Sequence, residues 1–189
     1  MRRALLALQV LATPVMAETW PALVLQSEHP VEGMRGGNLS GLAVCQGEMW
    51  AVSDRDDDQI YRLDTRYPEW LAEAVSLHLP QPPKTGLPWG VRMMGKAISP
   101  LRGGDLDFEG ITCDAAGNRY VVSESHAGVV LIAPQGNASW LKIDVGLVRQ
   151  ARASGMLLHF NALFEGIAIN PQGNQIWLAA ERERRGLLT

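Results

Sequence analysis

The sequence contains few of the residues and motifs on which common catalytic and metal sites depend. It has two cysteines and four histidines among 189 residues, and the histidines are scattered. No Gly-x-Ser-x-Gly motif is present, which excludes an α/β-hydrolase. Neither a His-Glu-x-x-His nor a Cys-x-x-Cys motif supports a zinc site. No glycine-rich loop precedes a helix, so a phosphate-cradling nucleotide site is not predicted.

Basic runs are also scarce. The formal net charge is −3, and the longest basic run is "RERR" at residues 182–185. Binding to nucleic acid is therefore not expected, because it depends on neutralising phosphates with Lys and Arg. No stretch after the N-terminus reaches the roughly 18 apolar residues that a membrane span needs, so the mature chain is predicted to have none.

The N-terminus has the features of a cleavable signal peptide. A basic "MRR" precedes the short apolar run "ALLALQVLA", and small residues end at Ala17. A buried N-terminal helix is the alternative, which the two arginines and Pro14 disfavour. Loss of residues 1–17 removes two arginines and changes the net charge from −3 to −5. We expect a mature domain of residues 18–189 in the periplasm or outside the cell.

The two cysteines do not amount to a disulfide framework. An exported protein would allow Cys45 and Cys113 to pair. However, Cys113 lies one position away from the equivalent of Cys45 when their sequence repeats are superposed. We therefore expect two half-buried thiols on strands rather than a disulfide.

One pattern occurs three times along the chain. It consists of a small or acidic residue followed by Gly, a short apolar segment, a turn, and a second apolar segment that ends in an acid. The copies are residues 38–55, 107–125 and 163–182. The first column of the repeat holds Ser40, Glu109 and Glu165, and the last holds Asp54, Glu124 and Glu181. β-branched and aromatic residues around a turn predict a β-hairpin in each copy.

Alternating segments after the first two copies extend each hairpin to about four strands. The predicted strands are 39–45, 48–54, 59–64 and 73–79 in one sheet, and 107–113, 119–124, 128–133 and 138–143 in the next. Helical patterning is nearly absent, with residues 147–160 as the single candidate. Repeated four-stranded antiparallel units are typical of a β-propeller. A β-sandwich is the alternative, but its hairpins need not repeat in sequence.

The predicted propeller is incomplete and carries one long insertion. The chain supplies about two and a half blades, whereas propellers close with roughly four to eight. We expect a domain truncated at its C-terminus, with an open sheet edge at that end; a ring closed by association with another chain is the alternative. Residues 80–106 contain five prolines and five glycines and are expected to be irregular, either as a surface insertion or as a loop over the active face.

The repeated acids are predicted to meet at one end of the channel. The start of one strand of an antiparallel hairpin lies beside the end of the other, so Glu109 should lie across from Glu124, and Glu165 across from Glu181. Asp54 should lie beside Ser40. The clustered charge could bind a hard cation, be neutralised by Arg55 and Arg182, or hold protons at raised pKa values. Strand-end acids that are simply solvated are the alternative.

The motifs "NLSGLAV…WAVSDRD…IYRLD", "DLDFEGIT…YVVSES" and "NALFEGIAINPQGNQIWLAAERE" resemble the family named for the esterase-like activity of phytase. The resemblance covers nearly all of residues 38–185 and implies a β-propeller with an acidic channel and Ca²⁺-dependent hydrolysis of esters or phosphoesters. Carried onto this chain, it implies metal ligands at Asp54, Glu109, Glu124, Glu165 and Glu181.

Two functions remain open at this point. In a metal-dependent hydrolase, Glu109, Glu165 and Glu181 would be catalytic, and Arg55 and Arg182 would bind a small-molecule ester or phosphoester. In a non-catalytic propeller of the cell envelope, the same face would bind a ligand or a protein partner. The charge balance at the channel distinguishes the two, because a phosphate site needs Lys or Arg near the acids.

Overall fold

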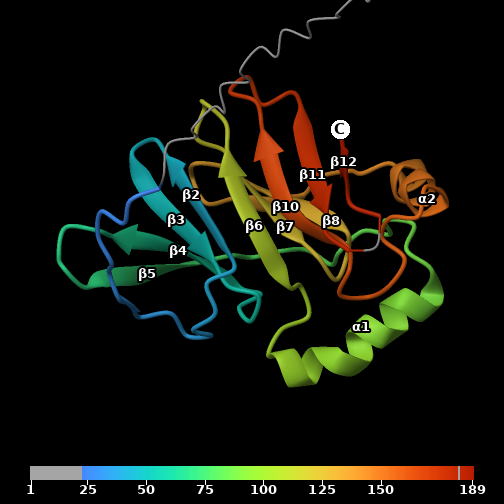
Figure 1. Cartoon of the computed structure of the whole chain (residues 1–189), viewed down its shortest axis with the longest axis horizontal. Coiled ribbons are helices and arrows are strands. Elements are labelled where there is room, and N and C mark those ends of the chain that lie inside the picture. The colour runs from blue at the N-terminus through green and yellow to red at the C-terminus, as the bar shows by residue number, and fades with distance from the viewer. Residues whose placement is uncertain (1–22, 183) are drawn as a thin grey trace, which may run out of the picture.

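The computed structural model describes residues 23–182 and 184–189. The predicted signal peptide therefore lies outside the described residues. Three sheets follow one another along the chain (Figure 1). The first contains β1 (Val31–Glu32), β2 (Gly41–Cys45), β3 (Glu48–Val52), β4 (Gln59–Asp64) and β5 (Trp70–Ser76). The second contains β6 (Phe108–Cys113), β7 (Arg119–Ser123), β8 (Gly128–Ile132) and β9 (Ala138–Trp140). The third contains β10 (Phe164–Ile169), β11 (Ile176–Ala180) and β12 (Gly186–Leu188).

The sheets are the blades of an incomplete β-propeller, as predicted. Consecutive strands pair antiparallel in the orders β5-β4-β3-β2, β6-β7-β8-β9 and β10-β11-β12, and the short β1 adds to β5 in parallel. The first strand of each repeat is the innermost, because β6 packs against both β2 and β10. Among the described residues the three blades do not form a closed ring, since β1 pairs with β5 and not with β12.

The hydrophobic core has two layers between blades and a third, smaller cluster around Ala51, Tyr61 and Leu63 of the first blade. Ile111 and Val121 of the second blade pack with Trp50 and Val52 of the first. On its other face, Val122 packs with Phe164 of the third. Alternate residues of the second blade thus face different neighbours, because successive side chains of a strand point to opposite sides. Each blade is stabilised by burial against the next.

The segment predicted to be irregular contains a helix, and that prediction was wrong. Residues Trp89–Arg102 form α1, which ends where Gly103 adopts a left-handed φ of 94° and donates to the carbonyl of Ser99. Figure 1 shows α1 at the end of the array from which β6 starts. Its two internal glycines and Pro100 are poor helix formers, which hid the helix from pattern analysis.

The second helix is shorter than predicted. The α2 helix (Val145–Ala153) begins at Asp144, whose carboxylate accepts a hydrogen bond from the backbone of Gly146 at 2.6 Å, and it ends just before Gly155 at φ 87°. This N-cap satisfies a backbone donor that the helix itself leaves unpaired. Within the described part of the chain, no helix is long and apolar enough to span a membrane.

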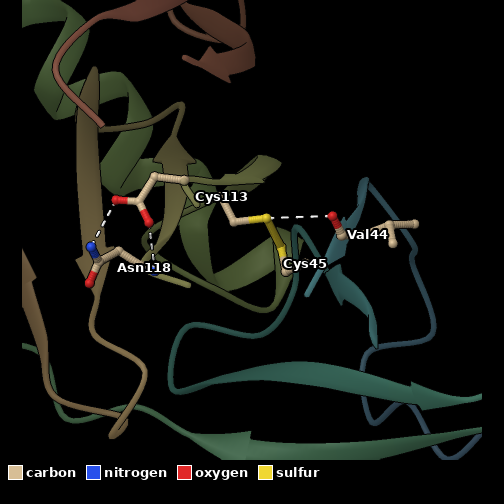
Figure 2. Close-up of a disulfide and its surroundings, with 5 residues drawn as sticks. Val44, Cys45, Cys113 and Asn118 are labelled. Atoms are coloured by element: carbon tan, nitrogen blue, oxygen red, sulfur yellow. Dashed lines mark hydrogen bonds between the residues drawn. A yellow bond between two sulfur atoms is a disulfide. The ribbon is translucent and has the colours of Figure 1, made fainter. Parts of the chain in front are cut away.

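Cys45 and Cys113 form a disulfide between the first and second blades, contrary to the expectation of free thiols (Figure 2). The one-position offset in the repeat is the reason that they meet. Equivalent residues of two blades point the same way around the array, whereas residues one position apart point to opposite faces. Cys45 on β2 therefore faces forward and Cys113 on β6 faces back, with their Cα atoms 5.9 Å apart.

Candidate functional site

Two of the predicted acids lie on β-bulges. The β6–β7 ladder shifts register at Glu109, and the β10–β11 ladder shifts in the same way at Glu165. A bulge leaves one residue unpaired in the ladder and changes the direction of its side chain. The β2–β3 ladder is regular from Gly41 to Cys45. The Phe-Glu-Gly motif thus places a carboxylate off the ladder at the same end of two successive blades.

Three carboxylates form a group in which one oxygen from each lies within 4.8 Å of the others. They belong to Asp54 after β3, Asp107 before β6 and Glu109 on the bulge. One carboxylate oxygen of Asp54 accepts a hydrogen bond from Asn38 at 3.1 Å, while its buried Oδ1 receives none from any described residue. The hydroxyl of Ser40, which we predicted beside Asp54, instead bonds backbone carbonyls of β3 and β6.

Glu124 is the most buried acid of the site, with 1% of its surface exposed. Its Oε1 accepts the backbone N–H of Leu163 at 3.0 Å, and its carboxyl is hydrogen-bonded to the side chain of Asp107. Burial raises the pKa of Glu124 to about 9, and the nearby charges of Glu165 and Asp107 act in the same direction. The raised pKa favours the protonated form of this carboxyl, which can donate a hydrogen bond.

Glu165 connects the second and third blades. Its carboxyl is hydrogen-bonded to those of both Glu124 and Glu181. Burial, and then the hydrogen bond and charge of Glu181, raise the pKa of Glu165 to about 7, although Glu124 and Arg182 oppose the shift. Glu165 thus holds a proton that it can release near neutral pH. The contacts extend without a break from Asp54 to Glu181.

The structure therefore brings the five predicted acids together, but it changes one pairing. We expected Glu109 to be a cross-strand neighbour of Glu124, either directly opposite or diagonal. The directly opposite residue is Asp107, because the backbone N–H of Glu124 donates to the carbonyl oxygen of Asp107 at 2.8 Å. The bulge at Glu109 shifts the register by one residue and puts Asp107 opposite Glu124. The metal-binding and catalytic roles of these acids stay predictions.

We call Asp54, Asp107, Glu109, Glu124, Glu165 and Glu181 the acid cluster. Sequence reasoning missed Asp107, which lies both in the group with Asp54 and Glu109 and beside the buried Glu124. It is buried, and its φ of 56° is in the left-handed region that side chains other than Gly rarely occupy. Such strain is common where a functional residue must be held in place. The available signal was a second acid two positions before Glu109. The third repeat has Leu163 there, so the position lay outside the repeated columns.

The two predicted arginines differ in their surroundings. The Nε of Arg182 lies 3.2 Å from Oε2 of Glu181, and about half of each side chain is exposed, so this ion pair adds little stability. Arg182 also lies near enough to Glu165 to lower its pKa. The side chain of Arg55 is exposed, and its hydrogen bond to a described residue is made by its backbone N–H, which donates to the hydroxyl of Ser53. Of the two, Arg182 is next to the acid cluster.

Comparison with solved structures finds weak similarity to propeller-type enzymes. Virginiamycin B lyase from Staphylococcus aureus is 12% identical, with a TM-score of 0.44, and the match covers 82% of this chain and 41% of the lyase. A streptogramin B lyase is 13% identical, with a TM-score of 0.43 and coverage of 86% and 43%. A gluconolactonase-like structure is 13% identical, with a TM-score of 0.41 and coverage of 75% and 35%. The chain thus spans less than half of each solved structure.

A family assignment comes from sequence. No curated protein matches the chain. The family profile named Phytase-like, and described as esterase-like activity of phytase, matches residues 35–186. The match contains all three repeats and every residue of the acid cluster. The chain therefore belongs to the Phytase-like family.

Proposed function

We propose that the protein is an exported hydrolase of phosphate or carboxylate esters, and that its acid cluster binds Ca²⁺ and transfers protons. The observation that carries the proposal is the continuous array of six carboxyl groups, two of which have raised pKa values. Like charges at such spacing are unfavourable without a cation or bound protons. The acids at the Asp54 end of the array are placed to share a cation, and those at the Glu165 end are placed to share protons.

The first part of the cluster fits a hard cation. Asp54, Asp107 and Glu109 offer oxygens within 4.8 Å of one another, and Oδ1 of Asp54 has no described hydrogen-bond donor. Ca²⁺ prefers carboxylate and carbonyl oxygens and takes six to eight of them, with water completing the set. When bound, Ca²⁺ would polarise a phosphoryl or carbonyl oxygen of the ester.

The second part of the cluster fits proton transfer. A general acid or base works best when its pKa is near the working pH, and the pKa of Glu165 is about 7. Glu181 accepts the hydrogen bond of Glu165 and holds its carboxyl in place. Protonated Glu124 donates to Glu165 from the buried side and stabilises the ionised form of Glu165. Glu165 would thus exchange a proton with the ester or with water, while Arg182 attracts an anionic substrate.

Two observations support export. The first is the signal-like N-terminus of the sequence. The second is the disulfide between Cys45 and Cys113, because disulfides persist mainly in oxidising compartments such as the periplasm or the extracellular space. Together they favour a periplasmic or secreted protein.

Loss of acid–base catalysis tests the hydrolase. Glu165→Gln should lower kcat by roughly 10²-fold or more, the usual contribution of a general acid or base. The substrates would be a panel of phosphate and carboxylate esters, assayed with Ca²⁺ present. Glu69→Gln is the matched control, because Glu69 is exposed on another part of the chain. Absence of hydrolysis across the panel by the wild-type protein would refute the proposal.

Calcium binding has a separate readout. Ca²⁺ at about 100 times its Kd should raise the free energy of unfolding by about 2.7 kcal/mol. Glu109→Gln should abolish this gain, and Glu69→Gln should retain it. An equal gain in both variants would place any bound calcium elsewhere.

One observation favours a binding protein as the second candidate. Of the two predicted arginines, Arg182 is the one that forms an ion pair with an acid of the cluster among the described residues, which is a small positive charge for a phosphate site. A propeller of this family that binds a ligand without cleaving it would respond to Ca²⁺ in the thermal assay and show no turnover.

A further inference from the structure

A cavity of about 540 Å³ lies between α1 and the hairpin of the second blade, beside the acid cluster. Its lining includes residues of the segment before α1, of α1 itself, and of the two chain segments that enter and leave the cluster. Asp105 and Leu106 precede Asp107, and Ser125 and His126 follow Glu124. Because neighbouring Cα atoms are 3.8 Å apart, the Cα atoms of these lining residues lie within roughly 4–8 Å of those of Asp107 and Glu124.

The charge of this cavity is opposite to that of the cluster. Lys84, Arg92 and Lys96 line it, and all three are exposed. Within the described part of the chain, none of the three makes an ion pair. Arg92 and Lys96 are four residues apart on α1 and therefore share a helix face, where like charges are unfavourable without an anion. The acid in the lining, Asp105, accepts a hydrogen bond from Ser99.

Apolar side chains form the rest of the wall. Leu87 and Leu106 are buried, whereas Trp89 is 71% exposed and Met93 is 44% exposed. An indole ring left in water at the edge of a cavity offers a flat surface on which an apolar or aromatic group can pack. The lining therefore combines cations with apolar contact area, which is the composition of a pocket for an amphipathic anion.

The cavity wall is held by specific contacts. The indole N–H of Trp140 donates to the carbonyl of Pro80 at 2.9 Å, and the hydroxyl of Thr85 donates to the carbonyl of His126 at 2.5 Å. These bonds fix the segment that carries Lys84 against the second blade. In the same wall, Nδ1 of His126 is buried and has no hydrogen-bond partner among the described residues. The site is thus formed before any ligand arrives, which lowers the entropy cost of binding.

We propose that this cavity is a substrate subsite that binds an aryl or alkyl group carrying a phosphate or carboxylate, with the anion on Lys84, Arg92 and Lys96 and the apolar group on Trp89 and Met93. The inference rests on the proposed hydrolase, because it assigns where the anionic and apolar groups of the ester bind beside the acid cluster. It also narrows the substrate class. Three cations beside an apolar wall suit an amphipathic anion better than a small polyanion with no apolar part.

Binding without turnover tests the cavity independently of catalysis. Phenylphosphonate, inorganic phosphate and benzyl alcohol would be titrated by calorimetry into the full chain in EDTA, so that no divalent cation bridges the ligand to the acid cluster. Phenylphosphonate should bind at least about tenfold more tightly than phosphate or benzyl alcohol, because it uses both parts of the wall. Equal affinity for phenylphosphonate and phosphate would overturn the proposal.

Matched variants separate the two contributions. Arg92→Glu with Lys96→Glu should weaken phenylphosphonate binding by roughly tenfold or more, since each lost cation removes a charge-assisted hydrogen bond. Trp89→Ala should weaken phenylphosphonate binding by roughly two- to tenfold and leave phosphate unchanged. All three residues are exposed, so the variants should keep the wild-type Tm. Unchanged affinity in both variants would overturn the proposal.

Glu165→Gln distinguishes the two proposals. It should lower kcat by roughly 10²-fold or more and leave phenylphosphonate binding unchanged, because Glu165 does not line the cavity. If the wild type binds phenylphosphonate but cleaves no ester, the proposed hydrolase fails and the cavity is a binding site only. If esters are cleaved but KM for an aryl phosphate is the same in Trp89→Ala as in the wild type, the subsite fails and the hydrolase stands.

Discussion

Replacing Glu124 by Gln should stabilise the protein at neutral and alkaline pH. Glu124 is 1% exposed, and burial raises its pKa from 4.5 to about 9. Gln resembles the protonated carboxyl in shape. Its carbonyl oxygen can accept from the backbone of Leu163, and its amide can donate to Asp107 and Glu165. The substitution therefore removes the need to keep a proton and retains the hydrogen-bonding groups.

The magnitude follows from linkage. A group whose folded pKa is raised holds its proton longer in the folded state, so the free energy of unfolding falls as pH rises from the unfolded to the folded pKa. Each pH unit in this window costs the wild type about 1.4 kcal/mol. From 4.5 to pH 7, the penalty reaches about 3 kcal/mol, and it grows until about pH 9. The variant carries no such penalty from this position.

Urea unfolding at several pH values, in EDTA to exclude bound cations, measures the difference. The gap between Glu124→Gln and wild type should be near zero at pH 4, about 3 kcal/mol at pH 7, and larger at pH 9. Glu69→Gln should show no pH-dependent gap, since Glu69 is exposed. A gap that is constant with pH would show that the pKa of Glu124 is not raised in the folded protein, and a variant less stable than wild type at pH 7 would contradict the prediction.

Three further predictions concern the disulfide, the pH profile and the channel. The disulfide between Cys45 and Cys113 links residues 68 positions apart, so its reduction should lower the free energy of unfolding by about 4 kcal/mol. The control is a double Cys→Ala variant, whose stability should not respond to reductant. A loss below about 1 kcal/mol would contradict the chain-entropy reasoning. The value of kcat/KM should change with pH around an apparent pKa near 7, and Glu165→Gln should remove this dependence. If the same pH dependence remains in Glu165→Gln, it belongs to another group. Gly41→Ala should destabilise the protein by roughly 1–3 kcal/mol, because the added Cβ would lie 2.9 Å from the backbone of β6. In Gly90→Ala the added Cβ has no neighbour within 4 Å, so this variant should stabilise α1 by roughly 0.5–1 kcal/mol. Similar thermal midpoints for the two variants would refute the crowding argument.

The blades were predictable because their signal is local. Alternating apolar residues and turn residues define each hairpin over fewer than twenty positions, and the structure places β2–β3, β6–β7 and β10–β11 within a few residues of the predicted limits. The repeat also identified the five acids that the structure brings together. Periodic spacing is sufficient for this, because the side-chain period of a strand and the antiparallel pairing of a hairpin do not depend on distant residues.

The remaining features depend on contacts between blades or, for Asp107, on a bulge within one blade, and the repeat pattern reports neither. The disulfide joins Cys45 and Cys113 because the two residues project from facing sides of adjacent blades. Asp107 entered the cluster because a bulge shifts the register by one residue and a left-handed φ turns the backbone. The raised pKa of Glu124 arises first from its burial in the assembled blades, and the hydrogen bond from the backbone of Leu163 opposes the shift. The sequence by itself determined the strands and the acids that they carry. The packing of one blade on the next decided which acids are in contact and which have a raised pKa. Burial and the proximity of charges are properties of the assembled blades, so the sequence pattern of one blade does not contain them.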